Sequence, residues 1–130
     1  MIQRSGDESL GTPFNIASYA FLTHLLAKHC GLEAYEFIHF VGNCHIYEEH
    51  IPQVNKQIAR SVSGVSGDGS DGSDPNGSGI YDFPKVIIKK AAPYISASIE
   101  DKLKWIEGLV YEDFELLNYK CGAPLSAIMK

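Results

Sequence analysis

The stretch QRSGDESLGTPFNIASYAFLTHLL, residues 3–26, changes character halfway along its length. Its first half gathers polar residues and glycines, whereas its second half is almost wholly apolar. Residues 15–30 carry apolar side chains on nearly every face of a helix, with Asn15 suited to cap the start and Gly31 the end. Because a helix that is apolar all round needs apolar partners on every side, we expect it to be buried.

The segments after this helix carry both strand and helix patterns. Residues 34–47, AYEFIHFVGNCHIY, are rich in aromatic and β-branched residues and predict a strand with a bend or bulge near Gly42. Residues 48–60 open with acids and close with Lys56 and Arg60, which is typical of a short amphipathic helix. A strand, a short helix and a polar turn into a strand are predicted at 83–89, 98–109 and 111–119. Mixed elements without regular βαβ alternation predict an α+β fold.

The composition predicts one domain, residues 1–130. With 130 residues, 45% of them hydrophobic, the chain is long enough for a single core. Residues 61–79 are almost entirely Ser, Gly and Asp, and predict a flexible loop within that domain. Asp68, Asp71 and Asp74 recur there every third residue, whereas calcium loops place ligands at alternate residues and end in glutamate. We therefore predict no metal site.

Charge and cysteine content exclude several classes of protein. The net charge is -5, so the basic excess needed for sequence-independent nucleic-acid binding is absent, and any bound anion must be held by a few placed donors. Three scattered cysteines argue against a disulfide framework and favour a reducing compartment. Without a signal-like start or an apolar run of about 20 residues, we expect a cytoplasmic protein that spans no membrane.

The cysteines and histidines do not form a pattern typical of a nucleophile or a metal site. Cys30 lies at the apolar end of the predicted helix, where we expect it to pack, and Cys121 has no base beside it in sequence. Cys44 and His45 are strand neighbours, which point to opposite faces unless a bulge intervenes. His45 and His50 are five residues apart, unlike the ligand spacings of zinc sites.

The polar half of the opening stretch is the strongest candidate for a ligand site. Arg4 offers a planar fork of donors, and Ser5 a hydroxyl, to a phosphate or carboxylate. Asp7 can accept N–H donors from a ligand ring, and the amide of Asn15 can pair with an edge that presents N–H beside a carbonyl, as uracil does. Ordinary structural roles explain these residues equally well: a surface ion pair for Arg4, a turn for Asp7 and a helix cap for Asn15. The ligand-site and the structural interpretation therefore both stay open.

A second, weaker candidate lies on the predicted strand. His45 and Tyr47 alternate along it and therefore share a face. Two hydrogen-bonding tips side by side can hold a hydroxylated ligand.

Two long motifs resemble the thymidylate synthase family. The opening stretch resembles QRSxDxxLGxPFNIASYxLLxH, and EFIHFVGNCHIY, residues 36–47, resembles EFIHxxGDxHIY, with the spacing between them that the family has. Downstream, FPKVIIK and YEDFELLNY resemble FPKLxI and FEDFELxxY. The resemblance implies the C-terminal part of a thymidylate synthase fold, in which a buried central helix packs on a mixed or antiparallel sheet.

The resemblance also implies an activity and its ligands. Thymidylate synthases are homodimers that reductively methylate dUMP to dTMP, with 5,10-methylenetetrahydrofolate as the one-carbon and hydride donor. Carried over to this chain, Arg4 and Ser5 bind the 5′-phosphate of dUMP, with Gln3 beside them as support. Asp7 contacts the folate ring.

The remaining family roles concern the nucleoside. Asn15 matches the residue that reads the pyrimidine edge; the related dCMP hydroxymethylases have an aspartate there, so uracil is favoured over cytosine. His45 and Tyr47 match the pair that holds the deoxyribose hydroxyl.

The chain also departs from the family. The family's nucleophilic cysteine lies in a PCH motif upstream of QRS, and no such motif occurs here, so we expect no catalytic residue in this chain and no activity from it alone. Asn43 replaces the usual Asp, residues 61–79 are inserted, and the tail CGAPLSAIMK resembles the family's closing segment only loosely. Two hypotheses follow: part of a thymidylate synthase, with an upstream fusion to dihydrofolate reductase left open, or a catalytically inactive remnant. Such a remnant would bind dUMP weakly or only assemble with a complete subunit.

Overall fold

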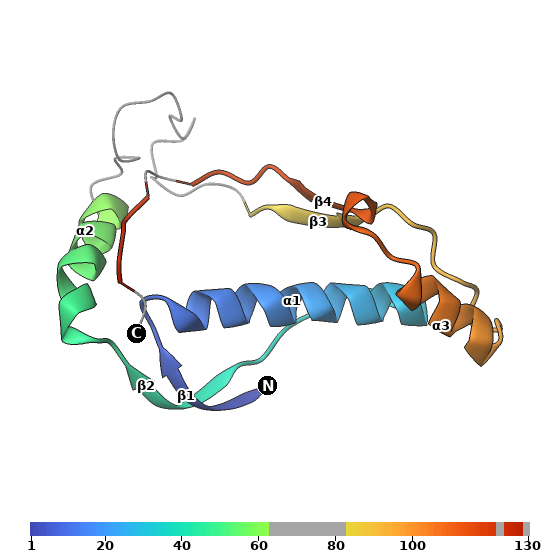
Figure 1. Cartoon of the computed structure of the whole chain (residues 1–130), viewed down its shortest axis with the longest axis horizontal. Helices are drawn as coiled ribbons and strands as arrows, with labels where there is room; N and C mark the ends of the chain where they lie inside the picture. The colour runs from blue at the N-terminus through green and yellow to red at the C-terminus, as the bar shows by residue number, and fades with distance from the viewer. Residues whose placement is uncertain (63–82, 122–123, 129–130) are drawn as a thin grey trace.

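The computed structural model describes residues 1–62, 83–121 and 124–128. Along the chain its elements are β1 (Ile2–Asp7), α1 (Gly11–Cys30), β2 (Phe40–His45), the 3-10 helix η1 (Glu48–His50), α2 (Ile51–Val62), β3 (Lys85–Ile88), α3 (Ile99–Glu107), the 3-10 helix η2 (Tyr111–Asp113) and β4 (Phe114–Leu117). The described residues thus combine three α-helices with two small sheets, which confirms the predicted α+β class. Figure 1 shows α1, the longest element, running between the β1–β2 pair and the β3–β4 pair.

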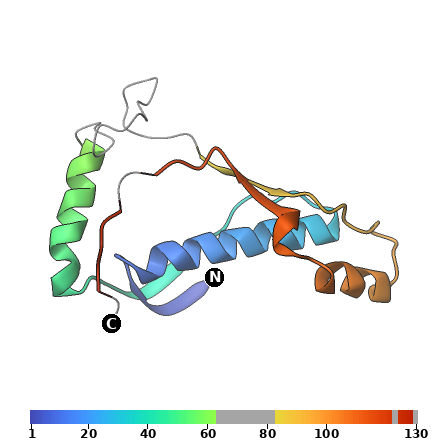
Figure 2. The same cartoon turned by 45° about the horizontal axis from the view of Figure 1, so that its top comes forward.

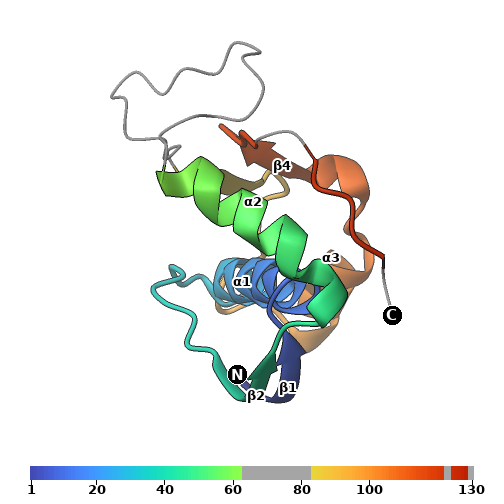
Figure 3. The same cartoon turned by 90° about the vertical axis from the view of Figure 1, so that its left-hand side faces the viewer.

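Strands β1 and β2 are parallel, and α1 is the connection between them. Parallel neighbours cannot be joined by a tight turn, so the chain needs a crossover of about a dozen residues or more to return to its starting edge. The 20 residues of α1 supply most of that return. Figure 3 looks nearly along α1 and shows β1 and β2 on one side of it and β4 on the other. The carboxyl ends of both parallel strands therefore lie together, beside the start of α1.

Residues 2–7 form a strand that the sequence did not predict. Arginine, serine, glycine and aspartate follow one another there, which is a composition more typical of a turn. The strand exists because its backbone pairs with β2, from Ile2 opposite Phe40 to Asp7 opposite His45. A pairing partner 38 residues away has overridden the local preference.

The predicted bulge near Gly42 is wrong. The pairing keeps one constant offset on both sides of this glycine, so β2 contains no extra residue. Gly42 instead permits a close approach between the strands, because a Cβ at this position would lie 3.0 Å from the carbonyl oxygen of Arg4. The strand is also shorter than the predicted 34–47, since β1 offers only six residues for pairing.

Helix α1 begins earlier than predicted and ends where predicted. It starts at Gly11 with Leu10 in the cap position, so the prediction that Asn15 caps the helix is wrong. At the other end Gly31 has φ of 67°, a left-handed conformation that glycine adopts without strain. The Leu32 amide donates to the carbonyl oxygen of Ala27 at 2.8 Å, which completes this glycine cap as the sequence predicted.

Aromatic contacts join α1 to the elements around it. Phe21 meets Phe114 of β4 edge to face, with 5.1 Å between ring centroids. His29 stacks on Trp105 of α3 at 5.6 Å. Such ring pairs stabilise by about 0.5–1.5 kcal/mol beyond their buried area. In Figures 1 and 2, α2 lies at the N-terminal end of α1 and α3 near its C-terminal end.

The expectation that α1 is buried is wrong for the chain as described. Thr12 is its one buried residue, and among the described hydrophobic side chains just Ile88 and Trp105 are buried. Four apolar side chains spaced along one face of the helix stay 41–50% exposed: Ile16, Tyr19, Leu22 and Leu26. We call these four the α1 stripe. Cys30, which we expected to pack, is exposed too. The other described elements are too few to cover every face of an all-apolar helix.

The remaining predicted elements are present with shifted boundaries. The predicted helix 48–60 is η1 followed by α2, which continues to Val62, so the predicted loop 61–79 is wrong at its first two residues and otherwise lies outside the described residues. Ser98 caps α3, because its side chain accepts a bond from the Asp101 amide at 3.1 Å. Strands β3 and β4 pair in antiparallel register. Among the described residues, none of the helices combines the length and the hydropathy that a membrane span requires.

The α1 stripe leads to a prediction about the 130-residue polypeptide in isolation. Exposed contiguous apolar side chains bind hydrophobic dyes and favour association. We expect strong fluorescence of the dye ANS with this polypeptide and a broad thermal transition in calorimetry. Changing Leu22 and Leu26 to Gln should lower the dye signal, whereas the same changes at Leu103 and Ile106 of α3, outside the stripe, should lower it less. A sharp cooperative melt without dye binding would contradict this expectation.

Candidate functional site

The sequence-predicted residues gather at the carboxyl ends of β1 and β2. Asp7 lies opposite His45 in the parallel register, and Ser5 lies opposite Asn43. The amide of Glu8 extends this pairing by donating to the carbonyl oxygen of His45 at 2.9 Å. Since alternate strand residues share a face and register partners lie side by side, these four paired residues occupy one face of the β1–β2 sheet.

Arg4 lies apart from the other predicted residues. Strand alternation directs its side chain to the face opposite Ser5, so the structure does not bring the two side chains together on one face. The Arg4 side chain is exposed, and no described residue pairs with its guanidinium. The surface ion pair that the sequence left open therefore has no partner within the described ranges, and the five N–H donors remain available to an anion.

Gln3 fixes the orientation of Asn15. The Nε2 of Gln3 donates to the Ser5 carbonyl oxygen at 2.7 Å, which leaves Oε1 as an acceptor. Oε1 then accepts from Asn15 Nδ2 at 3.2 Å and from His39 Nε2 at 3.0 Å. Because Asn15 donates one N–H to Gln3, its Oδ1 and its second N–H are the groups that can bind a ligand. His39 is a member of this cluster that the sequence did not single out.

Asp7 is held in a turn just before α1. Its Oδ1 accepts from the Ser9 amide at 3.0 Å and from the Ser9 hydroxyl at 2.6 Å. Burial alone would raise the pKa of Asp7, but bonds from Ser9 and the Leu10 amide, together with the nearby His50 ring, hold that pKa below its ordinary value. The turn interpretation is thus supported, and the carboxylate stays ionised at neutral pH.

His45 and Tyr47 lie together as predicted. Their rings meet edge to face with centroids 5.4 Å apart, although β2 ends at His45 and Tyr47 follows in extended backbone. His45 Nδ1 lies 3.2 Å from the Asn43 carbonyl oxygen, which can only accept, so Nδ1 carries a proton. In the neutral ring Nε2 is then the acceptor, and it can accept a hydrogen bond from a hydroxyl group of a ligand.

His50 is the residue of this region that sequence reasoning missed. Its side chain is only 2% exposed. Its Nδ1 lies 2.8 Å from Ser9 Oγ and 4.0 Å from Asp7 Oδ2, and its ring packs against Tyr47. Nothing in the local pattern marks it, because its side-chain partners Ser9 and Asp7 are more than 40 residues away along the chain.

Cys44 is poorly suited to act as a nucleophile. A hydrogen bond to Glu8 raises the pKa of its thiol, so less thiolate forms at neutral pH. The constant register of β2 also keeps Cys44 and His45 on opposite faces. Within residues 1–62, 83–121 and 124–128, no group of three His, Cys, Asp or Glu side chains is placed to hold a metal ion.

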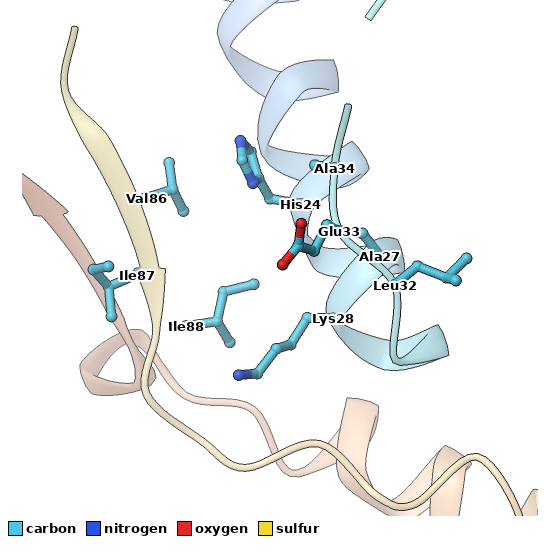
Figure 4. Close-up of a pocket in the computed structure, with 9 residues that line it drawn as sticks. All are labelled: His24, Ala27, Lys28, Leu32, Glu33, Ala34, Val86, Ile87 and Ile88. Atoms are coloured by element: carbon cyan, nitrogen blue, oxygen red, sulfur yellow. The ribbon is translucent and has the colours of Figure 1, made fainter. Parts of the chain in front are cut away.

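A pocket of about 410 Å³ lies between α1 and β3, away from this cluster. Figure 4 shows Val86 and Ile88 of β3 facing the helix, with His24 and Lys28 reaching toward them from α1. None of the predicted ligand-binding residues lines it. The pocket is therefore separate from the candidate site.

Comparison with known proteins agrees with these motifs. The family model for thymidylate synthase matches residues 1–67. The chain is 35% identical over 129 residues to a probable thymidylate synthase of Schizosaccharomyces pombe, an alignment that covers 99% of this chain and 16% of that protein. The crystal structure of thymidylate synthase from T4 phage is 32% identical and superposes with a TM-score of 0.71, covering 98% of this chain and 39% of that one. The chain therefore spans well under half the length of these relatives.

The lowered pKa of Asp7 predicts how the turn responds to acid. A carboxyl group whose pKa is lowered by folding stabilises the folded turn above its unfolded pKa of about 3.9, and this contribution is lost as pH falls through the lower folded value. We expect the amides of Ser9 and Leu10 to be protected from hydrogen exchange at pH 6 and to lose protection in strong acid. Asp7→Ala, which leaves these amides without a side-chain acceptor, should remove the protection at both pH values, and Glu36→Gln, which removes an exposed carboxylate, should not. Protection that persists unchanged at pH 2 would contradict this account.

Proposed function

Because the chain belongs to the thymidylate synthase family, we propose that it forms the part of such an enzyme that binds dUMP and 5,10-methylenetetrahydrofolate for the reductive methylation of dUMP to dTMP. One observation carries the proposal: the two family motifs meet at one end of the β1–β2 pair, where Asp7 lies opposite His45. Asp7 and His45 are 38 residues apart in sequence, so only the parallel pairing brings the polar side chains of the two motifs to one place.

The phosphate is assigned to Arg4 and Ser5. Arg4 has free, exposed donors, and a guanidinium binds phosphate oxygens in a bidentate manner. Since the two side chains start on opposite faces of β1, we propose that the phosphate lies at an edge or end of this strand, where both can reach it.

The pyrimidine is assigned to Asn15. Gln3 holds the Asn15 amide so that one acceptor and one donor remain for the ligand. The uracil edge offers an N3–H donor beside a carbonyl acceptor and matches this pair, whereas the cytosine edge has an acceptor and an amino group at those places. Gln3 and His39 act through Asn15 and are positioning residues in this proposal.

The sugar and the folate complete the site. The rings of His45 and Tyr47 present two hydrogen-bonding tips side by side for the deoxyribose hydroxyl. The Asp7 carboxylate, ionised and fixed by Ser9, accepts N–H donors of the folate ring. The chain's residues thus bind and orient the two substrates, and we assign the nucleophile to none of Cys30, Cys44 and Cys121. By analogy with the family, we propose that the complete enzyme is a homodimer.

A second candidate function is assembly without catalysis. The α1 stripe favours it, because four exposed apolar side chains on one helix are suited to contact another polypeptide. Two measurements on the 130-residue chain separate the candidates. We expect dUMP binding by titration and no tritium release from 5-tritiated dUMP. Turnover would contradict the absence of a nucleophile, and failure to bind dUMP together with co-elution with a complete thymidylate synthase subunit would favour assembly.

The phosphate assignment predicts an order of effects on dUMP affinity in the complete enzyme. Arg4→Ala should raise the Kd for dUMP about 10- to 100-fold, since a hydrogen bond to a charged group contributes about 1.5–3 kcal/mol. Asp7→Ala should raise it less, because Asp7 is assigned to the folate. Lys56→Ala, an exposed cation of α2, serves as the control for charge alone. Titration that places Asp7→Ala above Arg4→Ala would overturn the phosphate assignment.

The pyrimidine assignment predicts a change in base preference. Asn15→Asp should raise the affinity for dCMP relative to dUMP by about tenfold or more, because a carboxyl group can accept from the cytosine amino group. Asn55→Asp on the exposed side of α2 is the matched control and should leave the ratio unchanged. An unaltered preference for dUMP in Asn15→Asp would argue against this role.

A further inference from the structure

His50 is the one fully buried side chain among the described residues. Burying an imidazole away from water is unfavourable unless both ring nitrogens find partners. Both do: Nδ1 lies 2.8 Å from Ser9 Oγ and Nε2 lies 2.8 Å from the carbonyl oxygen of Ile128. These partners are 41 and 78 residues away along the chain, so the ring ties three distant segments together.

The segment held by Nε2 is the tail, residues 124–128. A second bond fixes it, from Gln53 Nε2 of α2 to the Ser126 carbonyl oxygen at 3.1 Å. In Figure 2 the tail, in red, runs beside α2 toward the start of α1. His50 therefore lies between the tail and the turn that carries Asp7.

The hydrogen bonds determine where the protons are. The carbonyl oxygen of Ile128 can only accept, so Nε2 carries a proton. Ser9 has a single hydroxyl proton and donates it to Asp7 Oδ1 at 2.6 Å. In that arrangement Ser9 Oγ accepts from Nδ1, so both ring nitrogens act as donors. Asp7 Oδ2, 4.0 Å from Nδ1, supplies the balancing negative charge.

We propose that His50, doubly protonated, is a positioning residue that latches the tail onto the turn between β1 and α1 and, through Ser9, orients the Asp7 carboxylate. Both Ser9 bonds go to Oδ1, which leaves lone pairs on Oδ2 for an N–H of the folate ring. This last role rests on the proposed function, whereas the latch itself does not. A neutral ring at this position would force Ser9 to turn its proton away from Asp7.

The charge state and the latch are tested without any ligand, in the protein expressed from its complete natural coding sequence. Nitrogen-15 NMR should show protons on both ring nitrogens of His50 at pH 7. His50→Ala should speed hydrogen exchange of the amides at residues 125–128 about tenfold or more, whereas His24→Ala on exposed α1 should not. Tail exchange unchanged in His50→Ala would overturn the latch, and a ring with one unprotonated nitrogen would overturn the doubly protonated state.

The effect on Asp7 is tested with tetrahydrofolate as the probe in the presence of saturating dUMP. Ser9→Ala should raise the Kd for tetrahydrofolate about tenfold with little change for dUMP, and Ser18→Ala is the matched control. His50→Gln keeps an amide donor toward Ile128 but provides no donor to Ser9, so it should retain tail protection and still weaken tetrahydrofolate. If dUMP binds and both variants bind tetrahydrofolate as the natural protein does, the positioning role is wrong. If the natural protein does not bind dUMP, the proposed function fails, and the ligand-free measurements still decide the latch.

Discussion

The parallel pairing of β1 with β2 determines how the other elements are arranged. Parallel neighbours require a long return connection, and α1 provides it. The pairing places the carboxyl ends of both strands beside the start of α1 and leads the chain directly into η1. Each predicted ligand-binding residue except Tyr47 lies on β1, β2 or α1, and Tyr47 follows two residues after β2. Without this pairing the two family motifs would have no common surface.

Polar networks, more than apolar packing, hold in place the end of the molecule that carries the candidate site. Gln3 receives bonds from Asn15 and His39, and so links β1 to α1 and to the segment before β2. His50 links the turn between β1 and α1 to the tail, because its two ring nitrogens contact Ser9 and Ile128. Networks of this kind impose one geometry because each buried donor or acceptor that loses its partner costs about 1–3 kcal/mol. That requirement suits a site that must hold side chains in fixed orientations.

The opposite end of the molecule is organised differently. Rings meet there across α1, α3 and β4, and Ile88 and Trp105 form the small buried core. Three buried side-chain atoms have no hydrogen-bond partner among the described residues: His29 Nδ1 and Trp105 Nε1 lie in this part, and Gln53 Oε1 lies on α2. The α1 stripe adds four apolar side chains that the described elements leave exposed. Apolar contact there provides cohesion but leaves much of the helix surface open to a further polypeptide.

Features that depend on short-range chemistry could be predicted from the amino-acid sequence. It predicted the end of α1 at Gly31, the Ser98-led helix α3 and the strand β4, because caps, turns and periodicity act within a few residues. It also singled out Arg4, Asp7, Asn15, His45 and Tyr47, because their polar chemistry stands out against apolar neighbours and their motifs resemble those of a known family.

Features that depend on partners distant in sequence could not be predicted in this way. Strand β1 forms through pairing with β2, and Asn15 lies inside the helix it was expected to cap, oriented by Gln3. The exposure of the α1 stripe depends on which elements surround the helix, and the burial of His50 depends on Ser9 and Ile128. A residue's own chemistry states which bonds it can make, but the folded chain determines which partner comes within reach.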